Sequence, residues 1–280
     1  MSEPRDPVDP MDLLRLEPAG DGRYAVPLPE ASPEGGAVVY GGQLMAQMIM
    51  ASAAEQPEKY VKSMSTIFSR AGSYGAPIEV QVDGFHSGRT WASQLVTAVQ
   101  GGRLLTRAMV LLTAHEPDLI AHQIDPPAGV GKPDDGDPTD GIVFPGAEVR
   151  TANQPDDGDV AELAFWTRLP GGVDSLAASQ AIAAYDTNGA LIGLSMRRHG
   201  DLVRIEDAHH TLSTGVIGHR LEFHREFDAS SWLLVTQQAT FAGKGRVYGR
   251  GEIFTEDGTL VATFAQDSML KTAPNRGAAL

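Results

Sequence analysis

The 280-residue sequence contains no cysteine. This absence excludes disulfide bonds, thiolate metal ligands and a cysteine nucleophile, and it agrees with a reducing compartment. Long hydrophobic runs are also missing, since no stretch approaches the roughly 18 apolar residues that a membrane span needs. The opening residues, MSEPRDPVDPMDLLRL, carry acids and prolines where a signal peptide needs a basic and then an apolar region. We therefore expect a cytoplasmic protein without a membrane partner.

Positive charge is scarce, because 22 lysines and arginines face 36 acids and leave a net charge of −14. A chain this acidic repels nucleic acid and anionic lipid unless a local basic patch reverses the field. The basic clusters are short: Arg197-Arg198, and Lys244 with Arg246 and Arg250. Such clusters suit one small anion, such as a nucleotide phosphate, and do not suit a polyanion. We expect no nucleic-acid partner.

Standard metal and phosphate motifs are absent as well. The spacing of His209-His210, His219 and His224 matches no common zinc pattern, and the last two should face opposite sides of a strand. Neither Gly41-Gly42 nor Gly243-Lys244-Gly245 has the spacing of a P-loop. The nucleophile-elbow pattern Gly-x-Ser-x-Gly does not occur, which counts against an α/β-hydrolase. The sequence predicts neither a metal nor a cofactor.

The hydrophobic content of 42% supports a substantial core, and the length suits two domains of about 100–150 residues. An apolar run from Gly42 to Ala51 without a breaker predicts a buried helix. Turn signals separate the strand-like runs that follow. These runs are residues 63–69, 78–85, 91–100 and 104–112. A helix followed by antiparallel strands is typical of an α+β fold, with the helix against one sheet face.

A segment rich in Pro, Gly and Asp follows, from residue 116 to residue 158. This composition cannot form a core, so we interpret the segment as an interdomain linker that is longer than most. The predicted organisation is an N-terminal domain of residues 1–115, the linker 116–158 and a C-terminal domain of residues 159–280.

The helix-and-strand pattern then recurs. Residues 175–196 are mostly helical, with an interruption at Asp186-Thr187-Asn188-Gly189, and strand-like runs cover residues 216–223, 232–242, 246–255 and 260–270. The two halves align at a separation of about 155 residues, as for Ile67-Phe68-Ser69-Arg70 and Glu222-Phe223-His224-Arg225. The pattern indicates a duplicated domain whose halves pair edge to edge, which would cover two exposed sheet edges.

Several motifs in both halves resemble the TesB-like acyl-CoA thioesterases II, which are double-hotdog proteins. In the first half they include residues 40–47 (YGGQLMAQ) and 87–91 (SGRTW); in the second half they include 183–186 (AAYD), 219–227 (HRLEFHREF) and 257–266 (DGTLVATFAQ). The resemblance implies an α+β double hotdog, built from two fused hotdog domains. It also implies hydrolysis of the thioester of acyl-CoA to a fatty acid and free CoA. We expect the chain to act as a homo-oligomer.

Members of this family hold and activate the attacking water with an Asp, a Ser or Thr and a Gln. The resemblance places the aspartate on Asp186 and the glutamine on Gln266. A desolvated aspartate can act as the base, and an amide that both donates and accepts can orient water. Two structural alternatives stay open: Asp186 as the N-cap of a restarted helix, and Gln266 as an outward-facing residue of an alternating strand.

The family hydroxyl falls on Val216, which cannot form a hydrogen bond and is otherwise a β-branched strand residue of the core. Loss of one such contact costs about 1–3 kcal/mol, or roughly ten- to a hundredfold in rate. Ser213 or Thr214 would substitute if this part of the strand is bulged, and Thr211 is a more distant candidate. Otherwise the chain is a weakly active thioesterase or a non-catalytic acyl-CoA binding protein.

Gly41 and Gly42 begin the first predicted helix, where backbone N–H groups could polarise a thioester carbonyl. The alternative is that these glycines only allow close helix–sheet packing. A hotdog hydratase is another reading, but it needs an Asp/His pair on one loop, and no histidine lies near Asp186 in that arrangement.

Overall fold

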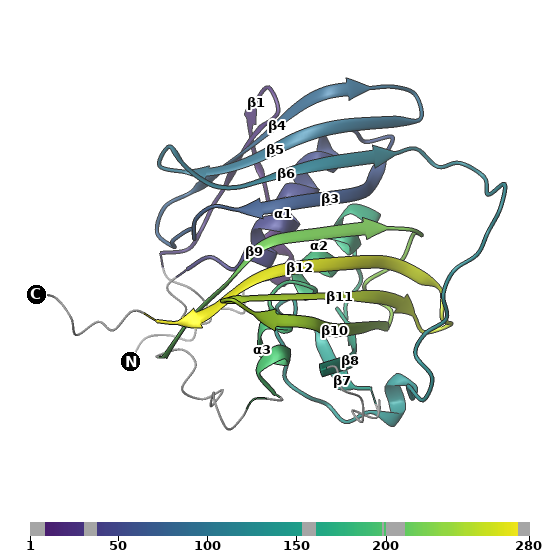
Figure 1. The fold of residues 1–280 in the computed structure, drawn as a ribbon. Helices are drawn as coiled ribbons and strands as arrows, with labels where there is room; N and C mark the ends of the chain where they lie inside the picture. The colour runs from purple at the N-terminus through teal and green to yellow at the C-terminus, as the bar shows by residue number, and fades with distance from the viewer. Residues whose placement is uncertain (1–8, 31–37, 153–160, 198, 200–210, 274–280) are drawn as a thin grey trace, which may run out of the picture.

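The computed structural model describes residues 9–30, 38–152, 161–197, 199 and 211–273. Their strands form one antiparallel sheet in the order β1-β2-β4-β5-β6-β3-β9-β12-β11-β10-β8-β7 (Figure 1). The first half contributes β1 (Glu17–Gly20), β2 (Arg23–Val26), β3 (Tyr60–Phe68), β4 (Ile78–Ser87), β5 (Trp91–Gln100) and β6 (Arg103–Thr113). The second half contributes β7 (Glu148–Thr151), β8 (Ala161–Arg168), β9 (Leu212–Phe223), β10 (Leu233–Gly243), β11 (Arg246–Thr255) and β12 (Leu260–Thr272).

The two halves meet where β3 pairs with β9, with Thr66 opposite His219. Each of these strands would otherwise leave a row of unpaired backbone groups at a sheet edge. The prediction that the halves pair edge to edge is confirmed. This joint also places the first half directly beside the strand that carries His219.

In the described part of the chain, the sheet is accompanied by three α-helices, α1 (Gly41–Ala54), α2 (Leu176–Asp186) and α3 (Ala190–Arg197), and by short 3₁₀ helices at Pro10–Leu14 and Pro133–Asp135. Helices α1 and α2 contact each other on one face of the sheet (Figure 1). Every residue from 42 to 49 of α1 and from 178 to 186 of α2 is buried. A helix covered by the sheet on one side and by a second helix on the other has no solvent face, which explains why α1 is apolar nearly all round.

The break between α2 and α3 agrees with the interruption predicted at residues 186–189. Helix α2 ends at Asp186, and Gly189 has φ +102°, a conformation that side-chain-bearing residues rarely adopt. The predicted bounds of β5 and β11 match the structure, whereas β1, β7 and β8 had not been assigned as strands.

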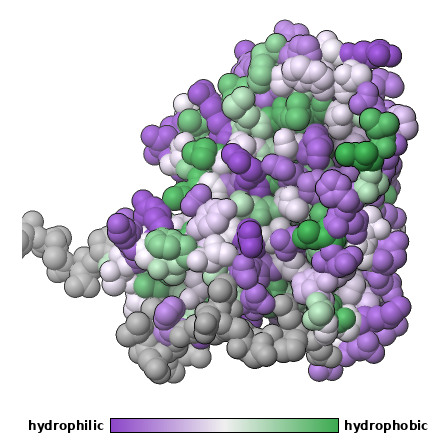
Figure 2. Space-filling model, turned by 45° about the vertical axis from the view of Figure 1, so that its right-hand side comes forward, coloured by the Kyte–Doolittle hydropathy of each residue, from purple (hydrophilic) through white to green (hydrophobic). Residues whose placement is uncertain are grey.

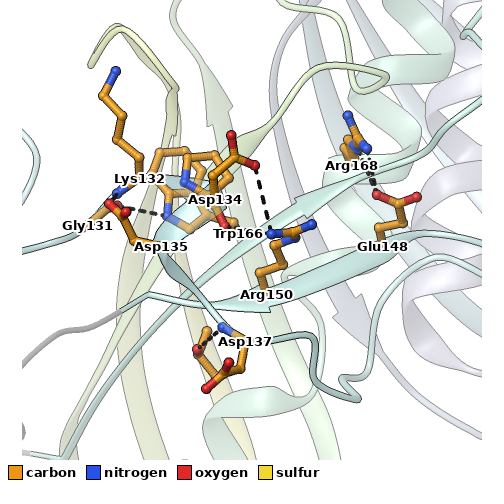
Figure 3. A network of polar contacts seen from close by, with 11 residues as sticks. Gly131, Lys132, Asp134, Asp135, Asp137, Glu148, Arg150, Trp166 and Arg168 are labelled. Carbon is orange, nitrogen blue, oxygen red and sulfur yellow. Dashed lines mark hydrogen bonds and ion pairs between the residues drawn. The ribbon is translucent and has the colours of Figure 1, made fainter.

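Part of the segment interpreted as a linker is docked on the second half of the sheet (Figure 3). Trp166 Nε1 donates a hydrogen bond to the carbonyl oxygen of Gly131 over 3.1 Å, and Arg150 Nη1 donates to that of Pro133 over 3.3 Å. Strand β7 also lies within this segment and pairs with β8. The division of the chain into domains at residues 115 and 159 stays a prediction.

Within the described residues, no helix is long and apolar enough to cross a membrane. The face in Figure 2 carries small apolar areas among hydrophilic side chains. Scattered apolar side chains of this kind are normal on a protein surface.

Substitution of Gly42 tests how closely α1 and α2 pack. A Cβ atom at Gly42 would lie 2.8 Å from the carbonyl oxygen of Tyr185, which is backbone and cannot move aside easily. We expect Gly42→Ala to lower the free energy of unfolding by about 1–3 kcal/mol through overpacking.

The matched control is Gly193→Ala in α3, where a Cβ would meet nothing within 4 Å. It should stabilise the protein by about 0.5–1 kcal/mol. Thermal and denaturant unfolding measure both variants. Equal stabilities for the two would show that the α1–α2 contact is looser than the structure has it.

Candidate active site

A buried polar cluster lies at the break between α2 and α3, facing β9 and β12. Its centre is Gln266 on β12, whose side chain is 1% exposed. Gln266 Oε1 accepts a hydrogen bond from the backbone N–H of Gly189 over 3.1 Å and lies 3.3 Å from His219 Nδ1. Gln266 Nε2 donates to Ser268 Oγ over 2.9 Å. The alternative that Gln266 faces outward is therefore wrong.

The contacts of Gln266 determine the tautomer of His219. Because Oε1 already accepts from the Gly189 N–H, it must also act as an acceptor toward His219, so Nδ1 carries the proton. The other ring nitrogen, Nε2, lies 3.2 Å from Thr187 Oγ1, whose single proton also faces the carbonyl oxygen of Ala184 over 3.2 Å. Burial lowers the pKa of His219 to about 4, so the ring is neutral at neutral pH. Within the cluster, His219 therefore donates to Gln266 through Nδ1 and contacts the Thr187 hydroxyl through Nε2.

Neighbouring residues hold His219 and Gln266 in place. The two are direct partners in the β9–β12 ladder, so their side chains share one sheet face. The ring of Phe264, two residues before Gln266, stacks on the His219 ring with 5.9 Å between centroids. Gly189 brings its N–H to Gln266 because its positive φ turns the chain between α2 and α3. Rigid elements therefore position the amide.

Asp186, the predicted base, is the last residue of α2 and is 2% exposed. Its Oδ1 accepts from the backbone N–H of Phe144 over 2.6 Å, and its Oδ2 accepts from the Thr167 hydroxyl over 3.4 Å. Both partners lie outside α3, so these contacts do not support the alternative role as an N-cap. Burial raises the pKa of Asp186 to about 7, although both hydrogen bonds act to lower it.

The structure does not join Asp186 to Gln266 through hydrogen bonds. Among the described residues, Asp186 bonds to Phe144 and Thr167, whereas Gln266 bonds to Gly189, His219 and Ser268. Two residues, Thr187 and Asn188, lie between Asp186 and Gly189, and Gly189 is the point where the α2–α3 turn touches Gln266. The assignment of a catalytic pair to Asp186 and Gln266 stays a prediction.

Val216 lies on β9, directly opposite Ser268. The substitutes proposed for its missing hydroxyl lie farther from Gln266 along the ladder: Thr214 is opposite Leu270 and Ser213 is opposite Lys271. The strand is indeed irregular here, since Ile217 is left without a partner between Gly218 and Val216. This irregularity leaves Ser213 and Thr214 in those distant positions, and Thr211 is exposed.

Gly41 and Gly42 lie at the first turn of α1, where this helix meets α2 and the helix break. A Cβ at Gly42 would collide with the backbone of Tyr185, and a Cβ at Gly41 would lie 3.1 Å from Asn188 Oδ1. Gly42 is therefore required for close packing of α1 against α2. The expected alternative was that the glycines allow close packing of a helix against the sheet. The role of their N–H groups toward a thioester stays a prediction.

Three cluster residues had not been predicted as functional: Thr187, His219 and Ser268. His219 was considered only as a metal ligand, and no group of three or more His, Asp or Glu residues able to hold a metal occurs in the part of the chain that the structure describes. Strand alternation could have identified Ser268, because it follows Gln266 by two residues and so shares its face. Nothing in the sequence pairs Thr187 with His219.

Comparisons with known proteins agree along nearly the whole chain. A family model described as the acyl-CoA thioesterase N-terminal domain matches residues 28–113, and one described as the acyl-CoA thioesterase C-terminal domain matches residues 124–270. Acyl-coenzyme A thioesterase 8 of Mus musculus is 25% identical over 297 residues, which cover 94% of this chain and 88% of that protein.

Solved structures agree as well. The acyl-CoA thioesterase II TesB2 from Mycobacterium marinum matches with a TM-score of 0.78 at 25% identity, over 95% of this chain and 99% of that one. A protein from Alicyclobacillus acidocaldarius with a hot dog fold matches with a TM-score of 0.73 at 19% identity, over 95% and 98% of the two chains. The predicted α+β double-hotdog fold and the resemblance to TesB-like thioesterases are confirmed.

The raised pKa of Asp186 predicts a pH-dependent stability. An acid whose pKa rises from 3.8 in the unfolded chain to about 7 in the folded one destabilises the protein increasingly as pH climbs through that window, by about 4 kcal/mol in full. Asp186→Asn removes this penalty, because its Oδ1 can still accept from Phe144 and its Nδ2 can donate to Thr167.

We expect the difference in free energy of unfolding between the variant and wild type to grow by about 2 kcal/mol, in favour of the variant, as pH rises from about 5.5 to about 8. Denaturant unfolding at each pH measures this difference. A stability difference that does not vary with pH would mean that Asp186 titrates near its ordinary value.

Proposed function

The chain belongs to the acyl-CoA thioesterase family, and from this premise we propose that the buried cluster around Gln266 is its catalytic centre. The enzyme hydrolyses the thioester of a fatty acyl-CoA to the free fatty acid and CoA. In this reaction the oxygen of a water molecule bonds to the carbonyl carbon, the C–S bond breaks, and the proton lost by the water ends on the CoA sulfur. The protein must hold the water, accept its proton and stabilise the carbonyl oxygen.

The observation that carries the proposal is the unused donor of the Gln266 amide. Nε2 bears two N–H groups, and the described contacts use one of them, toward Ser268. The other is free to donate to a water molecule or to a thioester oxygen. Because Oε1 is held by Gly189 and His219, the amide cannot turn away from this task. A fixed donor in a desolvated site is a strong contributor to catalysis.

Asp186 is the proposed base. Its pKa of about 7 suits a group that must accept a proton near neutral pH and release it again to the leaving thiolate. The hydrogen bonds from Phe144 and Thr167 occupy one lone pair on each carboxylate oxygen and leave others for a proton.

A thiol-release assay with acyl-CoA substrates of several chain lengths tests this proposal. Gln266→Ala should lower kcat by roughly 10- to 100-fold, since it deletes the amide that is held at the centre of the cluster. Gln238→Ala is the control, because that amide lies on β10 and binds Glu162. Equal rates for wild type and Gln266→Ala would reject the site, and tight acyl-CoA binding without any thiol release would identify a binding protein instead.

The pH dependence of kcat/KM tests the base separately. In wild type we expect the rate to rise with pH and to level off above about pH 7, because ionised Asp186 accepts the proton. Asp186→Asn should lower the rate and abolish this rise. A variant that keeps the wild-type profile would leave Asp186 only its structural contact with Phe144.

We also propose that the protein is a cytoplasmic homo-oligomer. The lack of cysteine supports a reducing compartment. The apolar side chains of Ile67, Met109 and Leu111 are exposed on the adjacent strands β3 and β6, which supports association between copies. Sedimentation should show an oligomer that Met109→Glu weakens; a monomeric wild type would exclude it.

A further inference from the structure

We propose that Ser268 supplies the hydroxyl that Val216 lacks, and that it holds the attacking water together with Gln266. The inference rests on the proposed catalytic role of the Gln266 cluster. The catalytic hydroxyl would then come from β12, at the position that pairs directly with Val216 on β9.

The position of Ser268 is the first argument. Ser268 and Val216 are direct partners in the antiparallel β9–β12 pair, so their side chains point to the same face, with Cβ atoms about 4.5–5.5 Å apart. The unpaired Ile217 produces this alignment, since Asp267 is opposite Gly218 and the next rung joins Ser268 to Val216. A hydroxyl on Ser268 therefore lies next to the place that a hydroxyl at position 216 would occupy.

The hydrogen-bonding capacity of Ser268 is the second argument. Its side chain is fully buried, and its Oγ accepts one hydrogen bond, from Gln266 Nε2. A serine hydroxyl offers two lone pairs and one proton, so one lone pair and the proton remain unused by the described residues. Buried polar groups normally find partners, and a water molecule between Ser268 and Gln266 would provide one.

These unused groups match what a nucleophilic water needs. The water accepts one hydrogen bond from the free N–H of Gln266, donates one proton to the free lone pair of Ser268 and donates the other to the base. One lone pair of the water oxygen is then left to attack the carbonyl carbon. When the oxygen–carbon bond forms, the proton passes to the base, so Ser268 orients the water without itself being deprotonated.

The other hydroxyls near the cluster suit this task less well. The Thr187 hydroxyl lies 3.2 Å from both the Ala184 carbonyl oxygen and His219 Nε2, so its one proton is already used. Thr66 is buried and has no side-chain hydrogen-bond partner among the described residues, but it lies on β3 opposite His219, so strand β9 separates it from Gln266. Ser268 is the one that contacts the Gln266 amide directly.

Steady-state kinetics of thiol release test the inference. Ser268→Ala should lower kcat by roughly 10- to 100-fold while KM changes little, because the hydroxyl contacts the water and does not bind the acyl-CoA. The double variant Ser268→Ala/Val216→Ser returns a hydroxyl from the opposite strand and should recover most of the lost rate. Ser52→Ala is the matched control: Ser52 is also fully buried, its hydroxyl has no hydrogen-bond partner in the described part of the chain, and it lies in α1.

The outcomes separate this inference from the proposed function. An inactive wild type, or full activity in Gln266→Ala, would reject the catalytic centre as a whole. An active wild type that loses rate in Gln266→Ala but not in Ser268→Ala would overturn the role of Ser268 alone. If Ser268→Ala is folded but slow, and the double variant stays equally slow, Ser268 only supports the strand and the inference is also overturned.

Discussion

The buried amide of Gln266 requires hydrogen-bond partners, and several segments of the second half of the chain converge to provide them. Gln266 lies on a central strand, away from water, where an unpaired amide costs several kcal/mol. Its partners come from three places: the Gly189 N–H at the helix break, His219 on the next strand and Ser268 on its own strand. The break in the helix supplies this first partner, because a continuous helix would keep the Gly189 N–H in its own hydrogen-bond ladder.

The joint between the halves protects the same region. Strand β3 pairs with β9 and thereby makes β9 an interior strand, with His219 buried between Thr66 and Gln266. On the helical side, the first turn of α1 packs against α2 so closely that Gly42 leaves no room for a side chain. The first half of the chain thus contributes to the desolvation of this region. That desolvation lowers the pKa of His219 and raises the pKa of Asp186.

Most of the fold could be predicted, because hydrophobic periodicity is a local property. The apolar run at residues 42–51 and the alternating runs of β5 and β11 were sufficient to predict those elements. Strand β8 was missed, since its sequence AELAFWTR does not alternate cleanly, and β7 was missed because Pro, Gly and Asp surround it. The duplication predicted that the halves pair edge to edge, whereas the structure showed that β3 and β9 are the edges that pair.

The sequence by itself determined the architecture and the family, since both depend on patterns along the chain, and it predicted a catalytic role for Gln266. It also marked Val216 as the position without a hydroxyl. Only the tertiary structure decided which side chains surround Gln266, because ladder register and a single unpaired residue, Ile217, determine that Ser268 lies opposite Val216. Likewise, the contacts of Asp186 with Phe144 and Thr167 join segments 42 and 19 residues away, a proximity that no local pattern encodes.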